Sequence, residues 1–324
     1  MRGELQADAA VLQERDVFTG RGWIKVIAPA KVNLHLAIGA KRADGYHDAI
    51  SIMHALSLHD TVYVRALPAS EQADTDVRIR MVGCGDVEAP AVEPDKNIAV
   101  RAARALRAAV IEQRADAPLC AVDIRIEKNI PAQAGLGGGS TDAAAVLVGL
   151  AKLWQVELDT QALAEIARTL GADVPFFLHG GCVYLDGAGD CFHHALDPRH
   201  DSVVLVKPAD GVSTAAAYAA FDEQPTFVAA HDAEAVRAIL DAAQISLFNN
   251  LAPAAERLMP ELAQIRCWLE GLPGVRGALL CGSGSTTFAP CDSFENACQA
   301  AAQARAHGYW ARTTAFSAIR AAVC

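Results

Sequence analysis

A cluster of glycines directly before an alanine-rich segment is the feature that most constrains the fold of this chain. Residues 131–142 read PAQAGLGGGSTD, with glycine at positions 135, 137, 138 and 139. Glycine adopts positive φ without a steric clash, so successive backbone N–H groups can turn toward one anion at the positive end of a following helix dipole. The segment predicts a phosphate-binding loop, and an ordinary strand-to-helix turn is the alternative.

The residues on either side of the glycines indicate which elements the loop joins. Before the loop, Val122, Ile124 and Ile126 alternate with charged residues, which is the period of a half-buried strand. After the loop, apolar residues recur at helical spacing, and Ser140 or Thr141 is the predicted N-cap of that helix. We therefore expect the loop to lie at a helix start.

Two common glycine-rich templates do not fit this loop. No Gly-Lys-Ser or Gly-Lys-Thr follows the glycines, so the lysine of a Walker A loop is absent. A dinucleotide-binding fingerprint that started at Gly135 would need its third glycine where Ser140 stands, and it would follow a first strand. The pattern therefore favours another class of nucleotide site.

Composition bounds the class of protein and its partners. The 324 residues are 52% hydrophobic and 20% charged, which predicts a globular chain of two domains. The 9 cysteines form no C-x-x-C pair, so we expect reduced thiols and no metal cluster. A net charge of −10 argues against a nucleic-acid partner. The sequence has no apolar run that could cross a bilayer and no signal-peptide pattern, so we expect a cytoplasmic protein without a membrane partner.

Three stretches are expected to lie outside the packed core. Residues 1–22 are polar and poorly periodic, which predicts a disordered extension before a first strand that begins at Ile24 and runs into Pro29. Residues 67–76 and 186–201 are rich in polar and turn-forming residues, which predicts exposed connections. The second of these is the candidate domain boundary.

Polar side chains alternate along the segment PAKVNLHL at residues 29–36. On a strand, Lys31, Asn33 and His35 would share the face opposite the apolar side chains. Such a strand can aim Lys31 and Asn33 at one ligand. A solvated strand face is the alternative.

An aromatic residue and a histidine follow a predicted turn in RADGYHDAISIMHAL, residues 42–56. Tyr46 and His47 suit a planar heteroaromatic ligand, because the phenol ring can stack on it and the imidazole can hydrogen-bond its edge. A packed turn in which Asp44 and Asp48 act as caps is the alternative.

A single carboxylate follows the helix predicted at residues 159–170. Gly171 suits the end of this helix, and Asp173 comes just after it, directly before the apolar residues 174–177. A carboxylate in apolar surroundings needs a compensating partner or a function. A capping or turn aspartate is the alternative.

A second glycine-serine segment, LLCGSGSTTFA, covers residues 279–289. Its glycines and serines at 282–285 separate two apolar runs. They predict either a tight hairpin turn or a loop whose backbone donors approach a phosphate or the first glycine loop.

Taken in order, these segments resemble the GHMP superfamily of small-molecule kinases. The resemblance runs from about Ile24 to Ala318, through PAKVNLHL, ADGYH, KNIAVRAARAL, PAQAGLGGGSTDAA, LGADVPFF, FNNLAPAA and CGSGSTTFA. Within the superfamily, PAKVNL and GADVP are typical of the branch that phosphorylates 4-diphosphocytidyl-2-C-methyl-D-erythritol in non-mevalonate isoprenoid biosynthesis.

The resemblance implies a fold and an organisation. The fold would be α+β with two domains, a ribosomal-protein-S5-like domain at residues 23–190 that carries the glycine loop and a ferredoxin-like domain at residues 191–324. The site would lie in the cleft between them. The expected partner is a small molecule, the cytidine-diphosphate-linked methylerythritol, and the chain is expected to be a monomer or a homodimer.

The resemblance also implies roles for single residues. Lys31 and Asp173 match the catalytic pair, with Asp173 as the base or orienting group for the accepting 2-hydroxyl. Two tyrosines would hold the cytosine between them, and a histidine would read its edge. The positions that match substrate contacts are Asn33, Tyr46, His47, Asp173, Thr214 and Tyr218.

ATP is the phosphate donor that the resemblance implies. Its γ-phosphate would be transferred to the substrate, and Mg²⁺ would arrive with ATP without a dedicated protein ligand. The positions that match nucleotide contacts are Asn97, Lys128, Pro131, Ala132, Gln133, Ala134, Gly135, Leu136, Gly137, Gly138, Gly139, Ser140 and Thr141.

Two alternative functions stay open at this point. One is another GHMP kinase, with a mevalonate-like or sugar substrate. The other is a nonenzymatic ATP-binding regulator on the same scaffold, against which the presence of both Lys31 and Asp173 argues.

Overall fold

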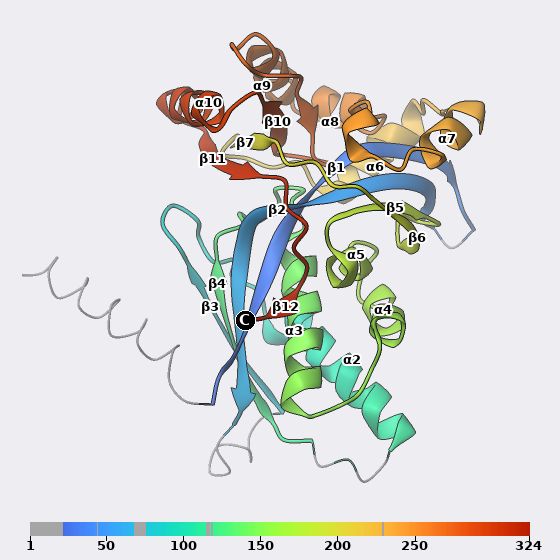
Figure 1. The fold of residues 1–324 in the computed structure, drawn as a ribbon, viewed down its shortest axis with the longest axis vertical. Helices are drawn as coiled ribbons and strands as arrows, with labels where there is room; N and C mark the ends of the chain where they lie inside the picture. Colours follow the sequence, from blue (N-terminus) through green and yellow to red (C-terminus); the bar gives the residue numbers. More distant parts are fainter. Residues whose placement is uncertain (1–21, 44, 68–75, 115–116, 118, 229) are drawn as a thin grey trace, which may run out of the picture.

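The structure is a computed structural model that describes residues 22–43, 45–67, 76–114, 117, 119–228 and 230–324. Two sheets with helices packed against them form the described fold (Figure 1). Nearly all of the expected extension at 1–22, most of the expected connection at 67–76 and the expected cap Asp44 lie outside the described residues.

The first sheet is built on two long antiparallel strands. Its strands are β1 (Ile24–Lys41), β2 (His47–Ala66), β3 (Val77–Gly83), β4 (Val122–Lys128), β5 (Cys182–Asp186), β6 (Cys191–Leu196), β8 (Phe248–Asn249) and β12 (Ala322–Val323). Their order is β12-β1-β2-β4-β3, while β5 pairs with β2 and β6, and β8 pairs with β1. β4 is the strand predicted before the glycine loop. The strand predicted from Ile24 continues through Pro29, because β-bulges absorb the irregularities along β1.

Helices cover one face of this sheet, as Figure 1 shows for α2 and α3. α3 (Gly138–Leu153) packs on β1 and β2, and α2 (Ile98–Gln113) packs on α3 and β3. α4 (Thr160–Arg168) and α5 (Val174–His179) pack against α3 and against each other. The alanine-rich sequence of α3 lets it approach the strands closely. A Cβ added at Gly149 would lie 2.9 Å from Val64 and 3.0 Å from Val26, on β2 and β1. This close packing fixes α3 relative to β1 and β2.

The second sheet has the order β11-β7-β10-β9 and is antiparallel throughout. Its strands are β7 (Ser202–Lys207), β9 (Leu279–Leu280), β10 (Thr287–Cys291) and β11 (Trp310–Ala315). The helices of this part of the chain are α6 (Thr214–Glu223), α7 (Ala230–Arg237), α8 (Ala252–Leu258), α9 (Glu261–Glu270) and α10 (Phe294–Ala306). Short 3-10 turns occur at η2 (Pro94–Lys96) and η3 (Ala242–Gln244).

A continuous apolar cluster joins the two sheets. It includes Leu34 and Ile52 from the first sheet with Leu205 and Phe288 from the second. In addition, β6, β8 and β12 come from the predicted second domain at residues 191–324 but pair within the first sheet, and Figure 1 shows the C-terminus beside β1. The division of the chain after residue 190 stays a prediction.

The expected exposed connection at residues 186–201 is wrong in part. It contains β6, which forms a hairpin with β5 through a turn in which Gly187 and Gly189 have φ of 71° and 83°. Most side chains of the edge strand β6 are exposed or half-buried, so its sequence is as polar as that of a loop. Within the described residues, no helix is both long and apolar enough to cross a membrane.

Candidate active site

Two polar side chains of β1 form the floor of the site. The Nζ of Lys31 donates to Asn33 Oδ1 at 2.9 Å, and Asn33 Nδ2 donates to Ser51 Oγ on β2 at 2.8 Å. Lys31 and Asn33 are both buried, which excludes the solvated strand face. The prediction that they point to one place is confirmed.

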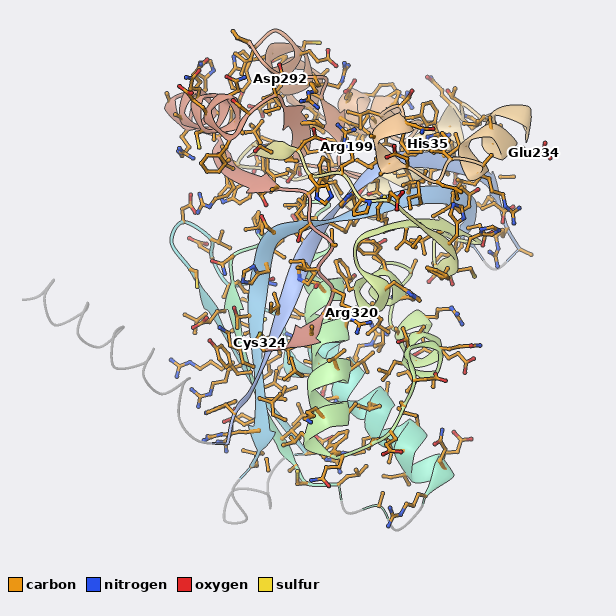
Figure 2. The ribbon with its side chains drawn as sticks, in the orientation of Figure 1. His35, Arg199, Glu234, Asp292, Arg320 and Cys324 are labelled. Atoms are coloured by element: carbon orange, nitrogen blue, oxygen red, sulfur yellow. The ribbon has the colours of Figure 1, made fainter. Side chains whose placement is uncertain are left out.

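His35 does not extend this polar face. A β-bulge lies between Asn33 and His35, and after it Leu36 lines the cavity beside Lys31. The His35 imidazole stacks on Phe248 of β8 at a centroid distance of 5.0 Å, in the upper part of β1 in Figure 2. Burial lowers the pKa of His35 to about 4. The expected shared orientation of three polar residues is therefore wrong for the third, because the alternation breaks at the bulge.

The helix predicted at residues 159–170 is α4, and its N-cap is Asp159, which accepts from the Ala162 N–H at 2.8 Å. Asp173 stands at the start of the short helix α5, where it makes no capping hydrogen bond with any described residue. Its carboxylate instead lies 3.3 Å from Lys31 Nζ, and its side chain is 34% exposed. The buried residues of α5, among them Phe177, hold the backbone at Asp173. An ion pair therefore joins β1 to α5, with the carboxylate open on one side.

The glycine loop enters α3 through a left-handed turn. Gly135 and Gly137 have φ of 73° and 74°, and Gly137 is the N-cap. The prediction of Ser140 or Thr141 as N-cap is wrong, because both lie inside the first turn of a helix that begins at Gly138. Since glycine has no side chain to cap with, the first N–H groups of α3 stay available to an anion.

Close packing restricts Gly137 as well. A Cβ added there would lie 2.5 Å from Phe177 Cζ and 3.1 Å from Lys31 Cγ. The loop therefore passes directly over the lysine of the ion pair, and the Lys31 N–H donates to the carbonyl of Leu136 at 3.0 Å.

The second glycine segment packs against the first. It forms the turn of the β9–β10 hairpin, and Thr286 N–H donates to the carbonyl of Ala134 at 3.1 Å. Ser285 Oγ donates to the carbonyl of Gln133 at 3.2 Å. A Cβ on Gly135 would overlap the carbonyl oxygen of Cys281. Both alternatives for this segment hold, since it is a tight turn and it also touches the first loop.

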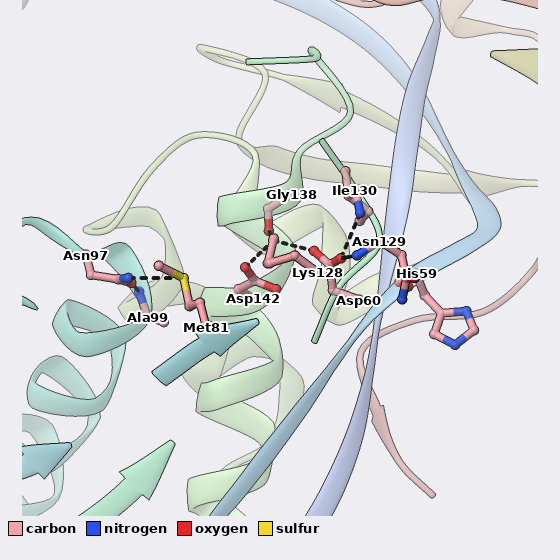
Figure 3. Close-up of polar contacts among 10 residues, drawn as sticks. All are labelled: His59, Asp60, Met81, Asn97, Ala99, Lys128, Asn129, Ile130, Gly138 and Asp142. Carbon is pink, nitrogen blue, oxygen red and sulfur yellow. Dashed lines mark hydrogen bonds and ion pairs between the residues drawn. The ribbon is translucent and has the colours of Figure 1, made fainter. Parts of the chain in front are cut away.

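A buried charge cluster supports the glycine loop from behind (Figure 3). The Lys128 ammonium forms an ion pair with Asp60 and donates to Asp142 Oδ2 at 2.5 Å and to the carbonyl of Gly138 at 3.5 Å. Asp60 also accepts from the Ile130 N–H at 2.9 Å. The cluster thus ties together β2, the end of β4 with the residues that follow it, and the first turns of α3. Asp60 and Asp142 were not found from the sequence.

Burial controls the electrostatics of this cluster. It raises the pKa of Asp142 to about 8, against the opposing effect of Lys128, and it raises the pKa of Asp60. Burial opposes the charge on Lys128, but the two carboxylates raise the pKa of its ammonium. Two carboxylates share one ammonium, so Lys128 is positioned to hold the loop more than to bind a phosphate.

Two cavities meet at the first glycine loop. The larger, of about 730 Å³, and the smaller, of about 370 Å³, are both lined by Gly135, Gly137 and Ser140. The larger cavity also contains Lys31 and Asp173. A phosphate on the loop would therefore be within reach of groups in both cavities.

The smaller cavity contains most positions predicted to contact the nucleotide. Asn97 lines it, although its side chain is also the N-cap of α2, which accepts from the Ala99 N–H at 2.9 Å (Figure 3). Thr141 is buried and lines neither cavity. The other predicted positions that line the smaller cavity are Lys128, Pro131, Ala132, Gln133, Ala134, Gly135, Leu136, Gly137, Gly138, Gly139 and Ser140.

The remaining predicted substrate residues lie together in the larger cavity. His47 lies with its ring centroid 5.2 Å from that of Tyr218, while Tyr46 is 59% exposed. Thr214 Oγ1 lies 3.0 Å from Ser283 Oγ in the second glycine segment. Burial raises the pKa of Tyr218 to about 12. All four predicted residues line this cavity.

Asp222 is a residue of this cavity that sequence reasoning missed. Its Oδ1 lies 2.6 Å from His47 Nε2, and its Oδ2 accepts from Lys41 Nζ at 2.9 Å. These hydrogen bonds lower the pKa of Asp222. The signal was present in the sequence, because Thr214, Tyr218 and Asp222 recur every four residues on one face of α6.

Comparisons with known proteins agree with this geometry. The family model of the GHMP kinases N terminal domain matches residues 97–181, and that of the GHMP kinases C terminal domain matches residues 220–309. The 4-diphosphocytidyl-2-C-methyl-D-erythritol kinase of Desulfitobacterium hafniense is 36% identical over 89% of this chain and 94% of its own length. The enzyme of that name from Pelotomaculum thermopropionicum is 39% identical over 87% of this chain and 94% of its own.

The chain belongs to the 4-diphosphocytidyl-2-C-methyl-D-erythritol kinase family.

Solved structures place this family member in the expected fold. A crystal structure of 4-(cytidine 5'-diphospho)-2C-methyl-D-erythritol kinase is 35% identical, with a TM-score of 0.69 over 90% of this chain and 100% of that chain. A homoserine kinase from Cytophaga hutchinsonii has a TM-score of 0.67 at 19% identity, over 94% of this chain and 98% of its own, which shows the fold alone. The predicted α+β GHMP kinase fold is confirmed.

Proposed function

We propose that this protein is an ATP-dependent kinase that transfers the γ-phosphate to the 2-hydroxyl of 4-diphosphocytidyl-2-C-methyl-D-erythritol, which gives the 2-phosphate and ADP. The relatives at 36% and 39% identity carry the name of this activity. The observation that carries the proposal is the Lys31–Asp173 ion pair at 3.3 Å, which lies in a cavity that meets a second cavity at a shared glycine loop.

The smaller cavity suits ATP, with its phosphates at the glycine loop. The uncapped start of α3 supplies N–H donors and the positive end of a 16-residue helix. Among the described residues, no group of three or more histidine, cysteine, aspartate and glutamate side chains is placed to hold a metal ion. In our proposal Mg²⁺ would enter with ATP and would neutralise part of the phosphate charge.

Phosphoryl transfer requires an aligned hydroxyl and neutralised phosphate charge more than covalent help from the protein. In our proposal the 2-hydroxyl oxygen bonds to the γ-phosphorus as the bond to ADP breaks, and the hydroxyl proton passes to Asp173. Lys31 faces the same point from β1 and offsets charge on the transferred group. The exposed side of Asp173 faces the larger cavity, where the substrate would lie.

The far end of that cavity suits the cytosine. Tyr46 and Tyr218 both line it, and an aromatic base could stack between their rings. His47 lies beside Tyr218 and would hydrogen-bond the edge of the base. Thr214 and Asn33 also line the cavity, and they would contact the diphosphate or the erythritol.

A coupled assay of ADP formation tests the proposal. We expect turnover with 4-diphosphocytidyl-2-C-methyl-D-erythritol and none with mevalonate or a simple sugar at the same concentration. Turnover with mevalonate or a sugar instead would support another GHMP kinase activity. ATP binding without turnover on any of them would support a regulatory protein on this scaffold.

A further inference from the structure

One carboxylate on α6 joins the adjacent ends of β1 and β2. Lys41 and His47 are antiparallel partners at the open end of these strands, and Asp222 contacts both. Its Oδ2 accepts from Lys41 Nζ at 2.9 Å, and its Oδ1 lies 2.6 Å from His47 Nε2. All three residues line the larger cavity. The Asp222 side chain is 34% exposed, whereas that of His47 is 6% exposed.

The carboxylate determines which nitrogen of His47 carries the proton. An ionised carboxylate only accepts hydrogen bonds, so Nε2 must donate to it. In a neutral imidazole the other nitrogen, Nδ1, is then an acceptor. Within the described part of the chain, Nε2 is the only ring nitrogen of His47 with a hydrogen bond. Tyr218 and Phe221 pack around the ring with centroid distances of 5.2 and 6.1 Å, which restricts its rotation.

We propose that Asp222 is a positioning residue that fixes the tautomer of His47 and thereby selects a 4-aminopyrimidine over a 4-oxopyrimidine base. The inference rests on the proposed function, in which this end of the cavity holds cytosine. An acceptor at Nδ1 can bind the exocyclic amino group of cytosine, which donates. The O4 atom of uracil only accepts, so the same imidazole would face it without a hydrogen bond.

Binding of cytidine and uridine diphosphates to the full-length protein tests this selection. The measurement is isothermal titration calorimetry, with the nucleotide site saturated by a nonhydrolysable ATP analogue. We expect the unmodified protein to bind cytidine diphosphate at least about tenfold more tightly than uridine diphosphate. Asp222→Asn should reduce this ratio by about tenfold, because an amide can donate to Nε2 and so allow the other tautomer. Lys41→Met is the matched control and should leave the ratio within about twofold, since it removes the other partner of the same carboxylate.

Nitrogen-15 NMR of the histidine rings gives a second readout, which a merely structural role would not change. We expect His47 to be protonated at Nε2 in the unliganded protein and to lose this preference in Asp222→Asn. An Asp222→Asn protein that keeps both the base preference and the tautomer would overturn the inference. An Asp222→Asn protein that binds both diphosphates more weakly by the same factor would also overturn the inference. Asp222 would then only support the ends of β1 and β2.

The outcomes separate the inference from the proposed function. If the unmodified protein prefers cytidine diphosphate and Asp222→Asn keeps that preference, only the role of Asp222 is wrong. If the unmodified protein binds neither nucleotide, the cytosine site itself is wrong, and the inference falls with it.

Discussion

Lysines flank the glycine loop on both sides, and their surroundings differ. In front of the loop, Lys31 is buried, but its acidic partner Asp173 is 34% exposed to a cavity. Behind the loop, Lys128 is buried between Asp60 and Asp142, whose side chains are 0% and 5% exposed. Both lysines lie within reach of the same few residues of the loop.

The difference shows that a buried lysine near a phosphate loop is not by itself evidence of a catalytic residue. A carboxylate that is open to a cavity can accept a hydrogen bond from a substrate hydroxyl, so the ion pair can take part in the reaction. Asp60 and Asp142 are almost fully buried, so they mainly satisfy the ammonium and fix the backbone around it, although Lys128 and Asp142 also line the smaller cavity. The front pair, Lys31 and Asp173, is therefore expected to affect turnover. The rear cluster of Lys128, Asp60 and Asp142 is expected to affect stability.

Removal of the charge at Asp173 should produce the largest effect. Asp173→Asn should lower kcat by about 10²- to 10⁴-fold, the usual contribution of general-base assistance, with little change in the unfolding midpoint. Steady-state kinetics and thermal unfolding check this. Asp292→Asn, at an exposed position that lines neither cavity (Figure 2), is the control and should keep kcat. A kcat like that of the unmodified protein would remove Asp173 from the mechanism.

Replacement of Lys128 should lower the free energy of unfolding, whereas replacement of Asp173 should lower turnover. Lys128→Met leaves the two buried carboxyl groups of Asp60 and Asp142 without the cation that they share, so the free energy of unfolding should fall by about 3 to 5 kcal/mol. Chemical denaturation measures it, and Lys152→Met, at an exposed lysine of helix α3, should change it by less than about 0.5 kcal/mol. An unchanged free energy of unfolding would mean that the rear cluster does not support the loop.

The two cavities should respond separately to loss of an aromatic ring. Tyr46→Ala should weaken binding of the cytidine-linked substrate by about tenfold or more, because base stacking contributes about 1 to 3 kcal/mol. The Kd of ATP should stay within about twofold, as calorimetry with each ligand would show. Phe294→Ala, at an exposed aromatic residue outside both cavities, should change neither. Equal losses for both ligands would contradict the division of the site into two cavities.

The pH dependence of stability should report on the rear cluster. Because burial raises the pKa of Asp142 to about 8, the folded protein holds a proton there that the unfolded chain releases near pH 4. Stability from this group is therefore lost as the pH rises toward and through about 8. Asp142→Asn removes this loss, so its stability relative to the unmodified protein should increase from about pH 5 to about pH 8, by at most about 1.4 kcal/mol per pH unit, and level off above about pH 8. A constant difference across this range would show that Asp142 titrates elsewhere.

Local patterns were sufficient to predict the parts of the site that one segment builds. The alternation before the glycines predicted β4, and the glycines themselves predicted the left-handed turn at Gly135 and Gly137. The shared orientation of Lys31 and Asn33 followed from the period of a strand. These features depend on neighbours within a few residues, whose geometry the backbone fixes.

Features that depend on distant partners were not predictable in this way. Asp60 pairs with a lysine 68 positions away, which no local pattern marks. The spacing along α6 indicates the face that Asp222 shares with Thr214 and Tyr218, but not its contact with His47 across 175 positions. The bulge that turns His35 away from the site arises from the pairing of β1 with β2, which the sequence of β1 alone does not contain. The helix N-cap was misplaced because a glycine in the left-handed region can begin a helix without a capping side chain.

The central claim is that Lys31 and Asp173 promote transfer of the γ-phosphate from ATP in the smaller cavity to the substrate hydroxyl in the larger cavity. Phosphorus NMR of the purified protein with ATP, Mg²⁺ and 4-diphosphocytidyl-2-C-methyl-D-erythritol tests it most directly. The account predicts a new phosphomonoester signal coupled to the 2-position of the erythritol, which the Asp173→Asn protein should form at least about 100-fold more slowly. A phosphate on any other position, or equal rates for the two proteins, would contradict it.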